Sequence, residues 1–170
     1  MKGLEDEGLV EYIPYRGCFA LGFTRQDIDD IYEVRKALEL LTIDWAIDKI
    51  TDAEIEELRL QCKKMEEYTA KFETEKAIGL NSSFHDIIYR AAGSRFMTQV
   101  LHSYKGYIDR AKKEVMYNQN YLFEVIKEHN EVFNGIKMRD KKKAKKAMSD
   151  HLDGSKRRAA ILYFDGKCIK

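Results

Sequence analysis

Three of the four histidines stand on stretches whose apolar spacing follows a helical period, and they are the residues best suited to chemistry. His129 lies within an apolar stripe, His85 has Ile88 one turn later, and His151 follows Met148 by one turn. Neutral imidazole is a good ligand for borderline divalent ions. Three such rings from separate helices could surround an ion and leave one coordination position open for another molecule.

A second interpretation of the same histidines remains open from the spacing alone. In it, each is a core residue that donates to a backbone carbonyl, and the rings never meet. Asn81 lies one turn before His85, the spacing of ligand pairs on metal-binding helices, but its neutral amide oxygen is a poorer ligand than a carboxylate. The fourth histidine, His102, has polar neighbours and is predicted to lie on the surface.

Arg35 stands at the edge of the apolar stripe of the first predicted helix. A guanidinium there could clamp a carboxylate ligand through two hydrogen bonds. It could equally form an ordinary ion pair, with Glu39 one turn later or with an acidic residue of another helix. The sequence leaves both roles open.

Two further motifs suggest chemistry of other kinds. His85-Asp86 is the metal-holding dipeptide of HD-type phosphohydrolases, which makes a metal-dependent phosphohydrolase the rival function. The basic run 141–146 invites a nucleic-acid interpretation, but its alternation with Ala144, Ala147 and Met148 favours the solvent face of an amphipathic helix. A metal-free dimerisation module is the third alternative.

These residues are positioned by helices. After Pro14, the only proline, the apolar spacing predicts six helices with short connections, which form an antiparallel bundle of the all-α class. Predicted caps are Thr24, Thr51, Gly93, Ser94, Asn118 or Asn120, and Asp140. The helices are expected at about 24–49, 51–72, 75–92, 94–116, 121–138 and 141–163. Residues 1–23 differ, because their glycines and short apolar run predict a helix end followed by a β-hairpin.

Composition sets the outer limits. The chain has 170 residues, 44% hydrophobic and 35% charged, which predicts one folded, soluble domain. Its net charge of +1 neither attracts nor repels nucleic acid. The three cysteines, Cys18, Cys62 and Cys168, are too far apart to predict a disulfide framework or a zinc knuckle. With no long apolar run and no signal-like start, we expect a cytoplasmic protein without a membrane partner.

In their order along the chain, four motifs resemble the GntR family of transcriptional regulators, in the branch that carries an FCD (FadR C-terminal) effector domain. The motifs are Leu4–Glu11 with Pro14–Phe19, Ile31–Glu39, Asn81–Ile88 with Ala91–Ser94, and Glu128–Asn130 with Asp150–Leu152. The first is similar to the last helix turn and wing of a winged helix-turn-helix, and the others to the FCD helices. The resemblance divides the chain into a wing remnant, 1–23, and an FCD effector-binding and dimerisation domain, 24–170, of six to seven helices.

The resemblance also implies roles for the site residues. His85, His129 and His151 would be metal ligands, with zinc or nickel the typical ion. Asn81 falls where many members place an aspartate ligand, so this site carries one negative charge less. Arg35 would face the pocket and bind a small organic acid.

The expected protein is therefore a regulator and not an enzyme. When intact, it would bind operator DNA as a homodimer. Since most of the helix-turn-helix would precede Leu4, we expect these 170 residues to be the sensing and dimerising half.

Overall fold

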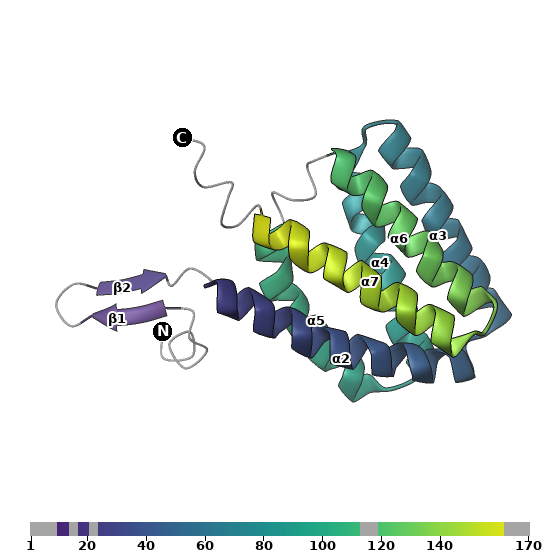
Figure 1. The fold of residues 1–170 in the computed structure, drawn as a ribbon, viewed down its shortest axis with the longest axis horizontal. Helices are drawn as coiled ribbons and strands as arrows, with labels where there is room; N and C mark the ends of the chain where they lie inside the picture. Colours follow the sequence, from purple (N-terminus) through teal and green to yellow (C-terminus); the bar gives the residue numbers. More distant parts are fainter. Residues whose placement is uncertain (1–9, 14–16, 21–23, 113–118, 162–170) are drawn as a thin grey trace.

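The structure, a computed structural model, describes residues 10–13, 17–20, 24–112 and 119–161. Six helices lie within these ranges: α2 (Arg25–Lys49), α3 (Asp52–Ala70), α4 (Thr74–Ala92), α5 (Arg95–Lys112), α6 (Gln119–Lys137) and α7 (Lys141–Ala160). They form a bundle (Figure 1), so the predicted all-helical architecture is confirmed.

The first helix boundaries are set by the predicted capping residues. The Thr24 hydroxyl accepts from the Asp27 amide at 3.1 Å, and the Asp27 carboxylate accepts from the Thr24 amide at 2.7 Å. Thr51 and Glu54 form the same reciprocal pair at the start of α3. Gly93 ends α4 with φ of 69°, a left-handed conformation that glycine adopts without strain. Local sequence chemistry therefore fixes where α2 and α3 begin and where α4 stops.

The later boundaries agree in part with the predictions. Asp140 caps α7, accepting from the Lys143 amide at 2.9 Å. Of the two candidate caps of α6, Asn120 lies inside the helix, because the helix already includes Gln119. Asn118, the other candidate cap, lies outside the described residues, as does Tyr163 at the predicted end of the last helix.

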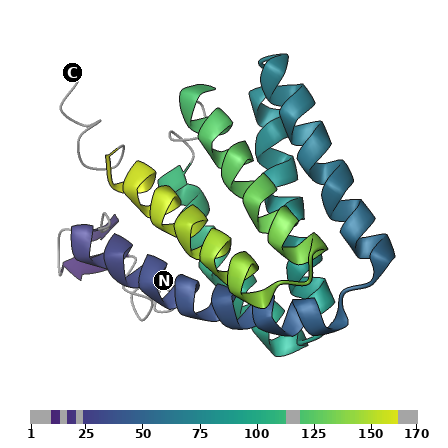
Figure 2. The ribbon, with the colours of Figure 1, turned by 45° about the vertical axis from the view of Figure 1, so that its right-hand side comes forward.

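The helices pack as a closed ring in which α2 lies beside α7, α7 beside α6, α6 beside α3, α3 beside α4, and α4 beside α2. Figures 1 and 2 show α2 running along α7, with α6 and α3 on the far side of α7. Ion pairs join α2 to α7 in antiparallel order: Asp29 and Glu33 with Lys156, Lys36 with Asp153, and Asp48 with Lys141. The ring encloses the space into which the candidate site residues point.

An apolar core fills most of this interior. Its large, fully buried members come from five helices: Ile43, Leu58, Met65, Phe84, Ile88, Ile136, Met148 and Leu152. Ala144 is also buried, whereas Lys142, Lys143 and Lys146 are exposed, which confirms that the basic run is the solvent face of an amphipathic helix. Cys62 is a buried free thiol, and burial raises its pKa to about 12.

Two short strands precede the bundle. β1 (Val10–Ile13) pairs antiparallel with β2 (Gly17–Ala20), in a register that sets Val10 opposite Ala20 and Ile13 opposite Gly17. The predicted turn residues 14–16 lie outside the described part of the chain, as does the helix end expected before the strands. The identification of this pair as the remnant of a wing stays a prediction.

Among the described helices, none combines the length and the apolar composition needed to cross a bilayer.

Two glycines inside helices provide a matched test of the packing. A Cβ on Gly135 of α6 would lie 2.6 Å from backbone atoms of Ala144 in α7, whereas a Cβ on Gly79 of α4 would meet nothing within 4 Å. We expect Gly135→Ala to lower the free energy of unfolding by about 1–3 kcal/mol, because the two backbones must move apart. Gly79→Ala should raise it by about 0.5–1 kcal/mol through helix propensity. Urea denaturation measures both, and equal effects would contradict the close α6–α7 contact.

Candidate metal centre

The three predicted histidines meet inside the bundle. His85 comes from α4, His129 from α6 and His151 from α7, and each is at most 4% exposed. One potential ligand nitrogen from each ring lies within 4.8 Å of the other two. The ring centroids of His129 and His151 are 4.5 Å apart, and His85 is 5.4 Å from both. The alternative in which the rings never meet is therefore wrong.

Each ring is held from behind through its Nδ1 atom. His129 Nδ1 lies 2.6 Å from the carbonyl oxygen of Val125, one turn earlier on α6. His85 Nδ1 faces a carboxylate oxygen of Glu39 at 3.3 Å, and His151 Nδ1 faces one of Glu128 at 2.9 Å. Because these oxygens accept hydrogen bonds, the neutral ring carries its proton on Nδ1 and presents the lone pair of Nε2.

The three Nε2 atoms are buried and belong to side chains whose ligand nitrogens are close together. Nitrogens bound to one tetrahedral zinc ion lie roughly 3–3.5 Å apart, so a separation of up to 4.8 Å requires only small ring movements. The donor set of neutral imidazoles with oxygen acceptors behind them suits a borderline divalent ion such as zinc or nickel. The residues therefore fit a transition-metal site.

Asn81 lies one turn before His85 on α4 and is 8% exposed. Its Oδ1 atom is buried and has no hydrogen-bond partner among the described residues. A buried acceptor without a donor costs free energy, and a cation can satisfy it. Its place in a ligand set stays a prediction.

Arg35 forms the ion pair that was one of its two predicted roles. Its Nε and Nη2 atoms both lie 2.9 Å from a carboxylate oxygen of Glu39, and both residues are buried. The third guanidinium nitrogen, Nη1, is also buried and has no hydrogen-bond partner among the described residues. The pair with Glu39 therefore involves Nε and Nη2 but not Nη1.

Glu39 links several groups at the centre of the bundle. Its carboxylate accepts hydrogen bonds from Arg35 Nε and, at 2.6 Å, from the Tyr89 hydroxyl. Its second oxygen faces His85 Nδ1. Burial raises the pKa of the Glu39 carboxyl, but the neighbouring His85 and Arg35 and the hydrogen bonds that Glu39 accepts outweigh it and hold the pKa well below the ordinary value. Burial raises the pKa of Tyr89, so its phenol stays protonated and donates. Glu39 is thus a carboxylate held in its charged form.

Glu128 has an equivalent place behind His151. The Arg158 guanidinium donates to both Glu128 carboxylate oxygens, at 2.8 and 2.7 Å, and also to Glu124 at 3.2 Å. Sequence reasoning did not identify Tyr89, Glu128 or Arg158 as site residues, and it considered Glu39 only as a partner of Arg35. A signal for Glu128 exists in the sequence, since it directly precedes His129 and lies one turn after Glu124.

The His85-Asp86 dipeptide does not form one site. His85 is buried in the cluster, whereas the Asp86 carboxylate is 43% exposed and lies 2.9 Å from His102 Nε2. His102 is 48% exposed, as predicted for a surface residue. A phosphohydrolase of the HD type needs both members of the dipeptide on the metal, so this geometry disfavours it.

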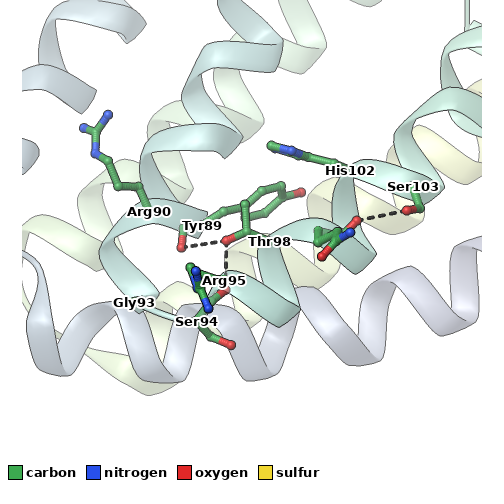
Figure 3. A pocket seen from close by; sticks show the side chains of 9 residues that line it. Tyr89, Arg90, Gly93, Ser94, Arg95, Thr98, His102 and Ser103 are labelled. Carbon is green, nitrogen blue, oxygen red and sulfur yellow. Dashed lines mark hydrogen bonds between the residues drawn. The ribbon is translucent and has the colours of Figure 1, made fainter.

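A separate surface cavity of about 720 Å³ lies between α4 and α5 (Figure 3). Its lining residues are Tyr89, Arg90, Gly93, Ser94, Arg95, Thr98, Gln99, His102 and Ser103. None of the predicted ligand residues is among them. Tyr89 reaches both regions, because it lines the cavity while its hydroxyl donates to Glu39.

Comparison with known proteins gives consistent matches. A model of the FCD domain matches residues 30–154. YdhC of Bacillus subtilis, an uncharacterised HTH-type transcriptional regulator, is 26% identical over 157 residues, covering 90% of this chain and 69% of YdhC. The structure of Escherichia coli McbR/YncC has a TM-score of 0.81 at 19% identity, covering 96% of this chain and 81% of that one. The structure of a GntR family regulator from Pseudomonas syringae has a TM-score of 0.69 at 13% identity, covering 98% of this chain and 69% of that one.

The buried ion pair predicts a large difference between two glutamates of α2. Glu39→Gln should lower the free energy of unfolding of the metal-free protein by about 3–5 kcal/mol, because it leaves the Arg35 charge uncompensated. Glu33→Gln, which removes an exposed pair with Lys156, should change it by at most about 1 kcal/mol. Urea titration measures the free energy of unfolding of both variants. Equal losses would contradict a buried Arg35–Glu39 ion pair.

The same pair has a pH signature. Since folding lowers the Glu39 pKa, its stabilisation is complete above the ordinary value of 4.5 and is lost as the pH falls below it. The unfolding free energy of Glu39→Gln should therefore fall less steeply on acidification than that of the wild type.

Proposed function

This chain belongs to the FCD domain family of GntR-type transcriptional regulators, and we propose that it senses a small organic acid through a metal ion held by His85, His129 and His151. The observation that carries the proposal is the convergence of three buried imidazoles from three different helices. The family makes the chain part of a regulator and not an enzyme, so the phosphohydrolase alternative is not pursued.

The metal would be a zinc or nickel ion bound by the three imidazoles, with the Asn81 amide oxygen as a further donor. When bound, it would supply a positive charge and an open coordination position at which an anionic ligand binds. Glu39, Val125 and Glu128 would hold the imidazole rings in their orientation, since each Nδ1 atom faces an oxygen of one of these residues. This preorganisation favours metal binding over three independently rotating side chains.

Arg35 is the proposed contact for the carboxylate of the effector. Its Nη1 atom is buried, and Glu39 on the same guanidinium faces His85. A cation and a guanidinium donor in one enclosed region favour a small acid over a neutral ligand of the same size. The proposed ligand class is therefore mono-, di- or tricarboxylates.

In the intact protein, residues 24–170 would form the effector-binding and dimerisation domain, and residues 1–23 would form part of the winged helix-turn-helix. We propose a cytoplasmic homodimer that binds operator DNA. The effector would act by binding one dimer geometry more tightly than another, so that only one matches the spacing of the operator half-sites.

Metal content tests the first part of the proposal. Protein purified without chelator should contain about one equivalent of a transition ion per chain. Replacing His85, His129 and His151 together by alanine should remove it, whereas His102→Ala should keep it, because His102 is exposed and lies outside the cluster. Elemental analysis measures the ion. A folded wild-type chain without affinity for transition ions would instead favour the metal-free dimerisation module.

Occupancy should also depend on pH in one direction. A protonated imidazole cannot bind a metal ion, so occupancy should fall as the pH drops through about 6, near the ordinary imidazole value. Dialysis against buffered zinc at several pH values checks this. Constant occupancy would contradict imidazole ligation.

Thermal shift against a panel of carboxylates tests the effector class. An acid that binds the native state should raise the melting temperature by mass action, and more so in the metal-loaded protein. Arg35→Lys should reduce the shift, because an ammonium lacks the donor geometry of a guanidinium, whereas Arg90→Lys at the surface should not. If no acid raises the melting temperature of the wild type, the effector proposal is wrong.

A further inference from the structure

Two of the three cluster histidines each contact a glutamate, and each of these glutamates accepts a hydrogen bond from an arginine. His151 faces Glu128, which accepts from Arg158. His85 faces Glu39, which accepts from Arg35. The Nδ1 atom of the third ring, His129, faces the neutral backbone carbonyl of Val125 on its own helix. The Nδ1 atoms of His85 and His151 thus face charged carboxylates, and that of His129 faces a neutral carbonyl.

We propose that Glu128, held by Arg158 and seated against Gly154, is a positioning residue that fixes His151 and supplies negative charge to the metal centre, and that Glu39 does the same for His85. This inference rests on the proposed metal-binding function. It concerns neither the ligand atoms nor the effector, but the carboxylates one hydrogen bond behind the ligands.

Charge balance is the first reason. The ligand set consists of three neutral imidazoles and one neutral amide, and no aspartate or glutamate is part of the cluster found among the described residues. A dication buried there gains from nearby negative charge, since interactions are strong in a poorly solvated interior. A carboxylate that accepts from Nδ1 also makes the opposite nitrogen a better ligand.

Gly154 is the second reason. It lies within α7, where a glycine costs about 0.5–1 kcal/mol relative to alanine. A Cβ at this position would lie 2.5 Å from a carboxylate oxygen of Glu128 and 3.1 and 3.3 Å from the two Arg158 nitrogens. The missing side chain therefore provides the space in which the carboxylate and guanidinium meet.

Glu124 offers a control on the same helix. It lies one turn before Glu128 and also accepts from Arg158, but it is 59% exposed, whereas the Glu128 carboxylate lies 2.9 Å from His151 Nδ1. Comparing Glu128→Gln with Glu124→Gln therefore separates the histidine contact from the loss of a charge beside Arg158.

The first experiment measures the affinity of the complete 170-residue chain for Co²⁺ by absorbance, and for Zn²⁺ by competition with a chromogenic chelator. Glu128→Gln should weaken binding about 10- to 100-fold, the usual cost of removing an oriented carboxylate behind a ligand histidine. Glu124→Gln should stay within about twofold of the wild type. Melting curves without metal establish that the variants are folded.

Gly154→Ala provides a second variant that keeps every ligand and every charge. Its methyl group should displace the end of the Glu128 side chain, which is flexible enough to move without unfolding α7. Affinity should fall several-fold, and the visible cobalt bands should shift in wavelength or intensity because His151 is oriented differently. A role of Glu128 in stability alone would leave these bands unchanged.

The outcomes are distinguishable. A wild-type chain that binds neither ion overturns the proposed function and this inference with it. A wild-type chain that binds, with Glu128→Gln and Gly154→Ala equal to it in affinity and cobalt spectrum, overturns only the positioning role. If Glu128→Gln does not fold, Gly154→Ala decides. Equal losses in Glu124→Gln and Glu128→Gln would show that Arg158, and not the contact with His151, is responsible.

Discussion

The architecture depends on ion pairs and hydrogen bonds that compensate for the burial of polar side chains in the bundle. Imidazoles, carboxylates and guanidinium groups occupy an interior that is otherwise apolar, and removing such groups from water is costly. Part of this cost is offset by hydrogen bonds: the Nδ1 atom of every cluster histidine faces an oxygen, and both Glu39 and Glu128 accept from an arginine. Removing one member of the Arg35–Glu39 or the Arg158–Glu128 pair leaves its partner charged and buried or partly buried.

This requirement explains the helix arrangement around the site. α2 supplies Arg35 and Glu39, and α4 supplies Asn81, His85 and Tyr89. α6 supplies Glu128 and His129, and α7 supplies His151 and Arg158. The surface ion pairs between α2 and α7 keep these helices in an antiparallel register, and the close approach at Gly135 does the same for α6 and α7. The site is therefore formed by a ring of helices that contact one another, and no single helix contains it.

Much of this was accessible from the sequence, because the relevant signals are local. Thr24 and Thr51 start helices through contacts three residues away, and Gly93 ends one through its own conformation. The inward direction of the histidines followed from helical spacing. The role of Glu128 did not, since it depends on the distance between α6 and α7 and on the absent side chain of Gly154. Spacing along one helix carries no information about such contacts, and the position of Glu39 opposite His85 was missed for the same reason.

Glu39 connects the two halves of the proposed function. Its carboxylate accepts from Arg35 and faces His85, so an acid bound at Arg35 would alter the same carboxylate that supports a metal ligand. Under the proposed function, effector and metal affinity are then coupled through one side chain, and linkage requires the coupling to be reciprocal. Whatever the acid does to metal affinity, the metal must do to acid affinity by the same factor. Because Glu39 occupies Nε and Nη2 of Arg35, the acid would bind at Nη1, which favours ligands that reach the metal and Nη1 together.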